Sequence, residues 1–285
     1  MLSERRLILG LNALSRAHAS DHFGDGHRGA AMVSAAFLCA ENAIEEEAAQ
    51  AIGRLIDAHW AHTALCEPVR GSAAKRQSLD LVAAALEANC GHLRQAGHNV
   101  IFASLALKAL AQLPKELTRD WAHGIVRLIE RFTTVDDVPV AEGDPLPPLN
   151  PLEPFAGFVL RETLRTMRDF EGRGQGWSGH MLTYGRAMLD LVEGGWQELA
   201  GKCLPAFAMY VARTRQGPLE SDTPRPEHPA SDLRPLAGAY WERRAGQDPG
   251  LGHCIKYPYG FYGLLRLVRD DGLREKCLRE SYRVL

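Results

Sequence analysis

Four histidines occupy equivalent places along this chain of 285 residues, each directly after a glycine and before an apolar stretch typical of a helix. They are His27, His98, His180 and His253. The intervals between them are 71, 82 and 73 residues, and this regularity indicates an internal repeat. Residues at the same place in repeated units lie at the same end of equivalent helices. We therefore expect the four imidazoles to converge on one site.

The four histidines are candidate metal ligands. A histidine at a helix N-terminus lies beside unpaired backbone N–H groups and the positive end of the helix dipole, which disfavour the charged imidazolium. Neutral imidazole is the form that binds a transition metal, and three or four nitrogen ligands suit iron, zinc or copper. Two alternatives remain open. In the first, the histidines are structural and cap helices or form hydrogen bonds with carbonyl groups. In the second, they donate and accept protons in a pocket without a metal.

Lys256 and Asp25 are candidate catalytic residues because of their positions next to two of the histidines. Lys256 lies three residues after His253, on the same helix face, where its charge interrupts an apolar pattern. Its amine would bind an anionic substrate or act as a base. Alternatively, the aliphatic part of the side chain would lie on apolar surface and the charged amine would reach solvent. Asp25 precedes His27 by two residues. Its carboxylate would bind the metal or orient an imidazole, or it would be a turn residue.

Two tyrosines are further candidates for the lining of the site. Each lies about one helical turn after a histidine, so both belong to the helix face that carries the histidines. The residues at this position in the four units are Ala31, Phe102, Tyr184 and Tyr257. Tyr184 and Tyr257 would line a pocket for a flat substrate and take part in catalysis, or they would be ordinary core residues.

The pattern of apolar residues predicts an all-α chain that forms a single domain over residues 1–285. We expect four units of three helices, at about residues 1–62, 76–132, 151–215 and 231–285. The helix after each Gly-His pair is apolar nearly all round and would be buried, whereas the helix that follows it is amphipathic. The first helices would begin at the capping residues Ser3, Ser78, Pro151 and Ser231. The units would form either an α/α-toroid-like ring or an open solenoid.

The composition argues against several functional classes. With 33 basic and 35 acidic residues, the formal net charge of −2 disfavours nucleic-acid binding. Six cysteines without a Cys-x-x-Cys pair indicate a reduced, cytoplasmic protein rather than a disulfide scaffold. No apolar run approaches the ~18 residues of a membrane span. The apolar stretch after Arg5 and Arg6 imitates a short signal peptide, but Asn12 and Arg16 interrupt it.

Two Pro-rich segments, residues 133–150 and 216–230, separate units of the repeat. Long connections without secondary structure are usually functional or disordered, so both segments are candidate lids over the site. The expected partner of such a site is a small-molecule substrate. The sequence does not indicate an oligomeric state.

The stretch from Phe23 to Val33, FGDGHRGAAMV, together with later helices that open with histidine, resembles the questin oxidase-like family. The resemblance extends over the repeat pattern of most of the chain. It implies a helical oxygenase that acts on a flat, polyketide-like aromatic substrate by a Baeyer–Villiger-like oxidation, with NADPH as a cofactor. The residues themselves predict only a histidine-lined helical cavity.

We therefore expect an enzyme, and an oxidoreductase of the monooxygenase type. One alternative is a metal-dependent hydrolase, lyase or cyclase that uses the same ligands, with the metal as a Lewis acid. The other is a non-catalytic helical-repeat protein that binds a peptide or protein on a concave face. A reactive residue repeated at helix starts favours the enzyme. No P-loop, Gly-x-Ser-x-Gly or His-Glu-x-x-His pattern supports a P-loop nucleotidase, a serine hydrolase or a metalloprotease.

Overall fold

The structure is a computed structural model that describes residues 3–114, 119–135, 138–140, 146–220 and 222–285. This part of the chain contains twelve α-helices, α1 to α12, and a few short 3-10 turns. Its only strand-like pairing is one isolated bridge between Arg94 and Thr134. The prediction of an all-α chain is therefore confirmed. Among the described helices, none combines the length and the apolar character that a bilayer crossing requires.

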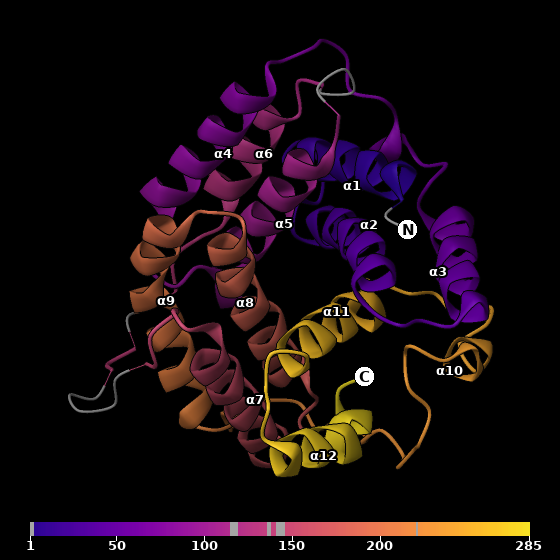
Figure 1. Cartoon of the computed structure of the whole chain (residues 1–285), viewed down its shortest axis with the longest axis vertical. Coiled ribbons are helices and arrows are strands. Elements are labelled where there is room, and N and C mark those ends of the chain that lie inside the picture. Colours follow the sequence, from indigo (N-terminus) through magenta and orange to yellow (C-terminus); the bar gives the residue numbers. More distant parts are fainter. Residues whose placement is uncertain (1–2, 115–118, 136–137, 141–145, 221) are drawn as a thin grey trace.

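Four helices are buried on nearly all sides, and each has a Gly-His pair at or near its N-terminus. These inner helices are α2 (His22–Glu41), α5 (His98–Gln112), α8 (Gly176–Glu193) and α11 (His253–Leu265). In succession α2 contacts α5, α5 contacts α8, α8 contacts α11, and α11 contacts α2. Figure 1 shows these four helices around the middle of the molecule. Helices without a polar face require such burial.

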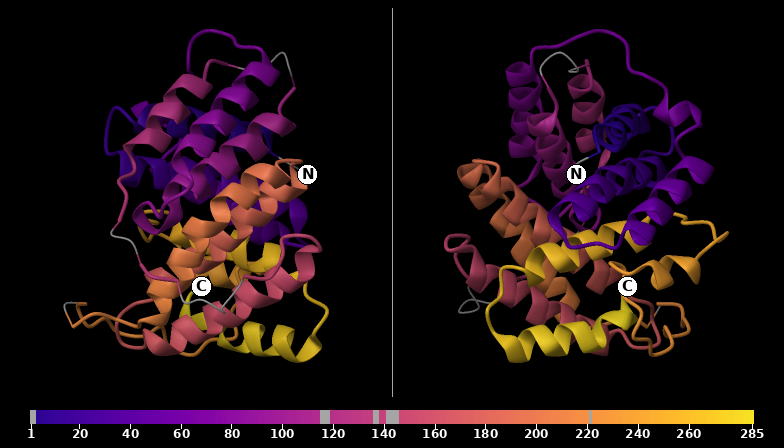
Figure 2. Two further views of the ribbon diagram at one scale, coloured as in Figure 1. Left: turned by 90° about the vertical axis from the view of Figure 1, so that its left-hand side faces the viewer. Right: turned by 45° about the vertical axis from the view of Figure 1, so that its right-hand side comes forward.

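The remaining helices lie outside the inner four (Figures 1 and 2). They are α1 (Glu4–Ala17), α3 (Glu46–His59), α4 (Lys75–Asn89), α6 (Ala122–Arg131), α7 (Leu152–Asp169), α9 (Gln197–Arg215), α10 (Gly238–Glu242) and α12 (Asp271–Glu280). In α6, for example, Ile125 and Leu128 are buried while Arg127 and Glu130 are exposed. One face of such a helix packs on the core and the other meets water.

The glycine before each histidine lets a neighbouring inner helix approach closely. A methyl group added at any of these glycines would overlap a side chain of another inner helix. The overlapping pairs are Gly26 with Phe102, Gly97 with Tyr184, Gly179 with Tyr257, and Gly252 with Ala31. Each partner is the residue one turn after a histidine, so the same contact recurs at all four junctions between inner helices. Only glycine leaves the space that this contact needs.

Two of the four Gly-His pairs start a helix, and the other two do not. α5 and α11 begin at His98 and His253, directly after glycines with φ of 85° and 69°. Glycine adopts such positive φ values without strain. In contrast, α2 and α8 begin about one turn earlier, so that His27 and His180 lie inside the helix. The expectation that all four histidines open a helix is therefore wrong for these two, because the preceding residues already have helical conformation.

The predicted N-terminal caps are confirmed at two first helices. The side chain of Ser3 accepts a hydrogen bond from the backbone N–H of Arg6, and Pro151 directly precedes α7. The cap expected at Ser78 is wrong, because α4 begins three residues earlier, at Lys75. Lysine is a good helix former, so the helix extends beyond the serine.

The first helix of the fourth unit is much shorter than expected. It is predicted to begin at Ser231, whereas α10 spans only Gly238–Glu242. Pro235 lies between these two positions. Proline has no backbone N–H and disfavours helical conformation in the residue before it. The residues from 231 to 237 therefore remain irregular.

The two Pro-rich segments are described only in part. Residues 136–137, 141–145 and 221 of the expected lids lie outside the described residues. The described part of the second segment is irregular and is fastened to the loop before α8. There the N–H of Arg225 donates to the carbonyl of Gly172 at 2.8 Å, and Glu227 accepts from the N–H of Gly172 at 2.5 Å. A lid function for either segment stays a prediction.

Candidate metal centre

Three histidine side chains meet through the same ring atom, Nε2. Nε2 of His98 lies 3.0 Å from Nε2 of His27 and 2.9 Å from Nε2 of His180. The ligand atoms of all three lie within 4.8 Å of one another. Each histidine comes from a different inner helix, near its N-terminal end. The structure thus brings together three of the four histidines that the sequence singles out, at separations that one metal ion can span.

The other ring nitrogen of these histidines, Nδ1, faces a backbone carbonyl in every case. The contacts are His27 Nδ1 to Phe23 O (2.8 Å), His180 Nδ1 to Gly176 O (2.7 Å) and His98 Nδ1 to Gln95 O. A carbonyl oxygen only accepts hydrogen bonds, so each Nδ1 must carry the ring proton and donate it. In each neutral ring, Nε2 is therefore unprotonated and carries a free lone pair.

Three such lone pairs in close proximity repel one another unless a cation lies between them. A proton is a poor candidate, because burial is the first cause that lowers the pKa of His27 and of His98 well below the usual value. Burial is also the first cause that lowers the pKa of His180, to about 4. The rings are therefore neutral at pH 7. A transition-metal ion, which requires neutral imidazole ligands, fits this donor set.

His253 lies beside the other three but is held differently. Its ring centroid is 5.2 Å from that of His27 and 5.2 Å from that of His180. The ring stacks on Tyr257, with the centroids 4.5 Å apart and the planes inclined by 11°. Its Nε2 is buried and has no hydrogen-bond partner among the described residues. Burial also lowers the pKa of His253, so this ring is neutral as well.

Lys256 is buried among the inner helices, and its amine forms no hydrogen bond or ion pair with the described residues. The amine lies 6.0 Å over the ring of Phe102. With Ser34 and Thr183 it lines an internal space of about 10 Å³, which is room for about one water molecule. Burial lowers the pKa of Lys256 well below its usual value and so favours the neutral amine. In that form the lysine is a base or a nucleophile.

Other buried charges on the inner helices are paired. Asp190 accepts hydrogen bonds from the amine of Lys108 at 2.7 Å and from the hydroxyl of Tyr259 at 2.6 Å. Lys108 also pairs with Glu41 at 2.5 Å. These contacts join α2, α5, α8 and α11, and Asp190 and Tyr259 also line the internal space next to Lys256. Lys108 and Lys256 thus differ in kind: the first has carboxylate partners and remains charged, and the second has none.

Aromatic rings that the sequence analysis did not select surround His27 and His98. The ring centroid of Phe23 lies 4.4 Å from that of His27 and 4.9 Å from that of His98. Phe132 lies 5.8 Å from His98, with nearly parallel planes. Phe23 precedes His27 by one helical turn, so helical periodicity could have identified it. Phe132 follows α6 and reaches the site only through tertiary packing, which leaves no local signal in the sequence.

The histidine centre is the clearest indication of function in the described residues. No family model, curated protein or solved structure matches this chain. The resemblance to the questin oxidase-like family therefore stays an expectation. The side chains of the site itself carry the functional assignment.

Two of the predicted site residues lie apart from the histidine centre. Asp25 accepts a hydrogen bond from the hydroxyl of Ser20 at 2.5 Å and pairs with Arg28 at 2.6 Å. Residues two apart on a helix point about 200° away from each other, so Asp25 cannot face the site together with the histidine that follows it. Tyr184 packs against α9, with its ring centroid 5.0 Å from that of Phe207. Neither residue is placed to act at the histidine centre.

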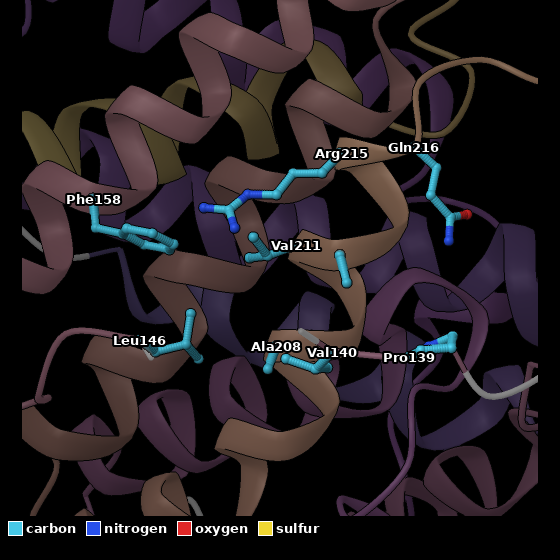
Figure 3. Close-up of a pocket in the computed structure, with 9 residues that line it drawn as sticks. Pro139, Val140, Leu146, Phe158, Ala208, Val211, Arg215 and Gln216 are labelled. Atoms are coloured by element: carbon cyan, nitrogen blue, oxygen red, sulfur yellow. The ribbon is translucent and has the colours of Figure 1, made fainter. Parts of the chain in front are cut away.

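A larger pocket, of about 220 Å³, lies at the surface between α7 and α9 (Figure 3). Its lining is mostly aliphatic, and the guanidinium of Arg215 extends toward the ring of Phe158, 5.9 Å away. None of the four histidines lines it. Arg215 is the only charged side chain among its described lining residues, so this lining provides no acid–base pair.

Tyr257 and Tyr184 provide a matched test of the site. The hydroxyl of Tyr257 lies 3.3 Å from Nδ1 of His180, whereas the buried hydroxyl of Tyr184 has no partner among the described residues. Tyr257→Phe is expected to weaken cobalt binding by less than about tenfold, because the contact that it removes is long. Tyr184→Phe is expected to leave cobalt affinity unchanged and to raise the free energy of unfolding by about 1 kcal/mol. Cobalt titration and urea unfolding measure both effects, and a larger loss of affinity in the Tyr184 variant would contradict this assignment.

Proposed function

We propose that this chain is a metal-dependent enzyme in which His27, His98 and His180 hold one transition-metal ion. The observation that carries the proposal is the convergence of three Nε2 lone pairs, each fixed by a carbonyl contact at Nδ1. Metal-binding histidines usually donate their second ring N–H in this way, which fixes the tautomer and the orientation of the ring. Three protein ligands would leave coordination positions free for substrate.

The donor set of three imidazole nitrogens would suit iron, copper or zinc, and iron or copper would supply redox chemistry. The histidine cluster found among the described residues contains no cysteine. It therefore lacks the thiolate ligands that are typical of structural zinc sites.

We further propose that four helical units close into a ring around this centre. Two observations support the ring over an open solenoid. The last inner helix, α11, contacts the first, α2. The glycine contact that links successive inner helices also recurs at that junction, between Gly252 and Ala31. In a solenoid the first and last units would lie at opposite ends.

The reaction that we propose is the oxidation of a small, flat substrate, as the family resemblance implies. A bound iron or copper ion would supply redox chemistry and a binding position for dioxygen. Phe23 and Phe132 offer ring faces near His98 for a planar aromatic group. The same rings keep bulk water away from the histidines. The neutral form of Lys256, which burial favours, provides a proton acceptor within the same set of helices.

A second candidate is Lewis-acid chemistry, such as hydrolysis, elimination or cyclisation, at the same metal. The observation that favours it is the unpartnered Nε2 of His253, since such a reaction uses a proton donor or acceptor next to the metal. The metal that supports turnover separates the two candidates. Iron or copper with consumption of dioxygen, measured with and without NADPH, supports oxidation, whereas turnover with zinc alone supports the Lewis-acid reaction.

The proposal predicts the metal content of the protein and its dependence on pH. Protein purified without a histidine tag is expected to contain about one iron or copper ion per chain. Protons compete with a metal only below the pKa of the metal-free ligands, which is about 4 for His180 rather than the usual 6.5. Metal content should therefore stay constant from pH 8 to about 5 and fall as the pH approaches 4.

Elemental analysis of protein equilibrated at each pH measures this profile, with circular dichroism as the control for folding. Protein that carries no transition metal, and takes up none of Fe²⁺, Cu²⁺, Zn²⁺ or Co²⁺ when these are supplied without oxygen, would overturn the proposed function. Loss of metal near pH 6.5 in folded protein would instead mean that the ligands titrate as exposed histidines do.

A further inference from the structure

We infer that His253 is not a fourth metal ligand but binds an anionic ligand of the metal, by donating a hydrogen bond from its Nε2. The inference rests on the proposed metal centre and assigns a separate role to one of its four histidines. The ligand would be a small anion or an ionised substrate oxygen, such as a phenolate, an enolate or a carboxylate.

The backbone around His253 differs from that around the three converging histidines. Those three all donate from Nδ1 to a carbonyl three or four residues earlier. Among the described residues, Nδ1 of His253 has no such contact. The carbonyl of Pro249, four residues earlier, instead accepts from the N–H of Gly252 at 2.8 Å. Nothing in the backbone therefore forces the proton of His253 onto Nδ1.

The comparison with His98 shows that this difference is not a simple result of lying at a helix start. Both helices begin directly at the histidine, after a glycine with positive φ. Before His98, however, Gln95 and Ala96 also have positive φ, 37° and 60°, which is uncommon for residues with a side chain. This conformation brings the carbonyl of Gln95 to His98. Strain of this kind is tolerated where a specific contact requires it, and His253 has no equivalent.

The ring of His253 is nevertheless held firmly at the site. It stacks on Tyr257 and lies 5.2 Å from the rings of both His27 and His180. Its Nε2 is buried without a partner in the described part of the chain. A buried polar nitrogen without a partner is unfavourable, so a ligand that accepts its hydrogen bond would gain affinity. Protonated on Nε2, the neutral ring is a donor to an atom bound at the metal.

The charge of the centre identifies the class of ligand. A divalent ion held by three neutral imidazoles retains both of its positive charges. The metal-binding cluster in the described residues contains no carboxylate, and Asp25 is paired elsewhere. A buried, uncompensated cation favours an anionic ligand, and the donor on His253 supplies that ligand with a second contact.

Azide binding to the cobalt-loaded protein tests the inference. Azide is a small anion that accepts hydrogen bonds, and its binding changes the visible absorption of Co²⁺. His253→Phe keeps a ring for stacking on Tyr257 but removes the donor. It is expected to retain about one cobalt per chain while its azide dissociation constant rises by about tenfold or more. His253→Gln restores an N–H donor and is expected to recover most of the azide affinity, whereas His27→Ala, as the control, should lose the cobalt itself.

The outcomes separate this inference from the proposed function. Loss of cobalt from both His253 variants, in folded protein, would identify His253 as a ligand and overturn the inference alone. So would an azide affinity that is unchanged in His253→Phe. A wild-type chain that takes up no cobalt would overturn the proposed metal centre, and the inference with it. Cobalt retention with weaker azide binding in His253→Phe and recovery in His253→Gln supports both.

Discussion

His98→Ala is expected to abolish metal retention while the protein remains folded. Nε2 of His98 lies close to the Nε2 atoms of both His27 and His180. Its removal therefore leaves only two of the three proposed ligands. Two neutral nitrogens bind a metal far more weakly than three. The fold should survive, because the apolar residues of α5 stay in place. We expect less than a tenth of the wild-type metal content after desalting, with a melting temperature close to that of the metal-free wild type.

Combining His98→Ala with His180→Ala distinguishes a shared site from separate helix caps. In a shared site each single change already removes the metal and the activity, so the double variant should be barely worse. Independent structural roles would instead lower the free energy of unfolding by about 1 kcal/mol each and add in the double variant. His62→Ala, at an exposed histidine, is the control. Additive stability losses in a parent protein without metal would show that the histidines are structural.

Lys256→Met is expected to raise the free energy of unfolding at neutral pH by several kcal/mol. The amine of Lys256 is buried and unpartnered among the described residues, and burial of a cationic group without a partner is costly. Methionine fills a similar volume without a charge. Lys276→Met, at an exposed lysine of α12, is the matched control and should change stability by no more than about 0.5 kcal/mol. Urea unfolding followed by circular dichroism measures both variants.

The effect of Lys256 depends on pH, and its sign follows from the direction of the pKa shift. The pKa of Lys256 is lowered in the folded protein, so between that pKa and about 10.4 the unfolded chain binds more protons than the folded one. The contribution of Lys256 to unfolding free energy should therefore rise with pH by about 1.4 kcal/mol per unit in this window. Lys256→Met should lack this rise, so its advantage over the wild type shrinks as the pH increases. An unchanged slope would mean that water solvates the ammonium.

The convergence of three histidines could be predicted from the sequence, because each of the four candidates follows a glycine and precedes an apolar stretch at regular intervals. The same reasoning could not separate His253 from the other three. That difference depends on where the preceding carbonyls point, and the positive φ of Gln95 and Ala96 is not indicated by their residue types. The sequence pattern thus identified the members of the site but not their individual roles.

Asp25 and Tyr184 lie apart from the histidines for specific reasons. Asp25 is a candidate because it precedes His27 by only two residues. In the structure both residues belong to α2, and helical geometry turns residues two positions apart to different sides. Tyr184 occupies the same repeat position as Tyr257, but its ring fills the space beside Gly97 and packs against α9. Equivalent positions in a repeat share backbone geometry, not surroundings.

Helix α11 contacts both α2 and α8, and these contacts affect how the chain folds during synthesis. A nascent chain that ends before Gly252 would leave an apolar face of α2 and another of α8 open to solvent at the same time. We expect such a chain to need protection from aggregation until about its last eighth is made. An open solenoid tolerates the loss of its last repeat. Deletion of α11 would instead also destabilise α2, near the N-terminus, because α11 packs against it.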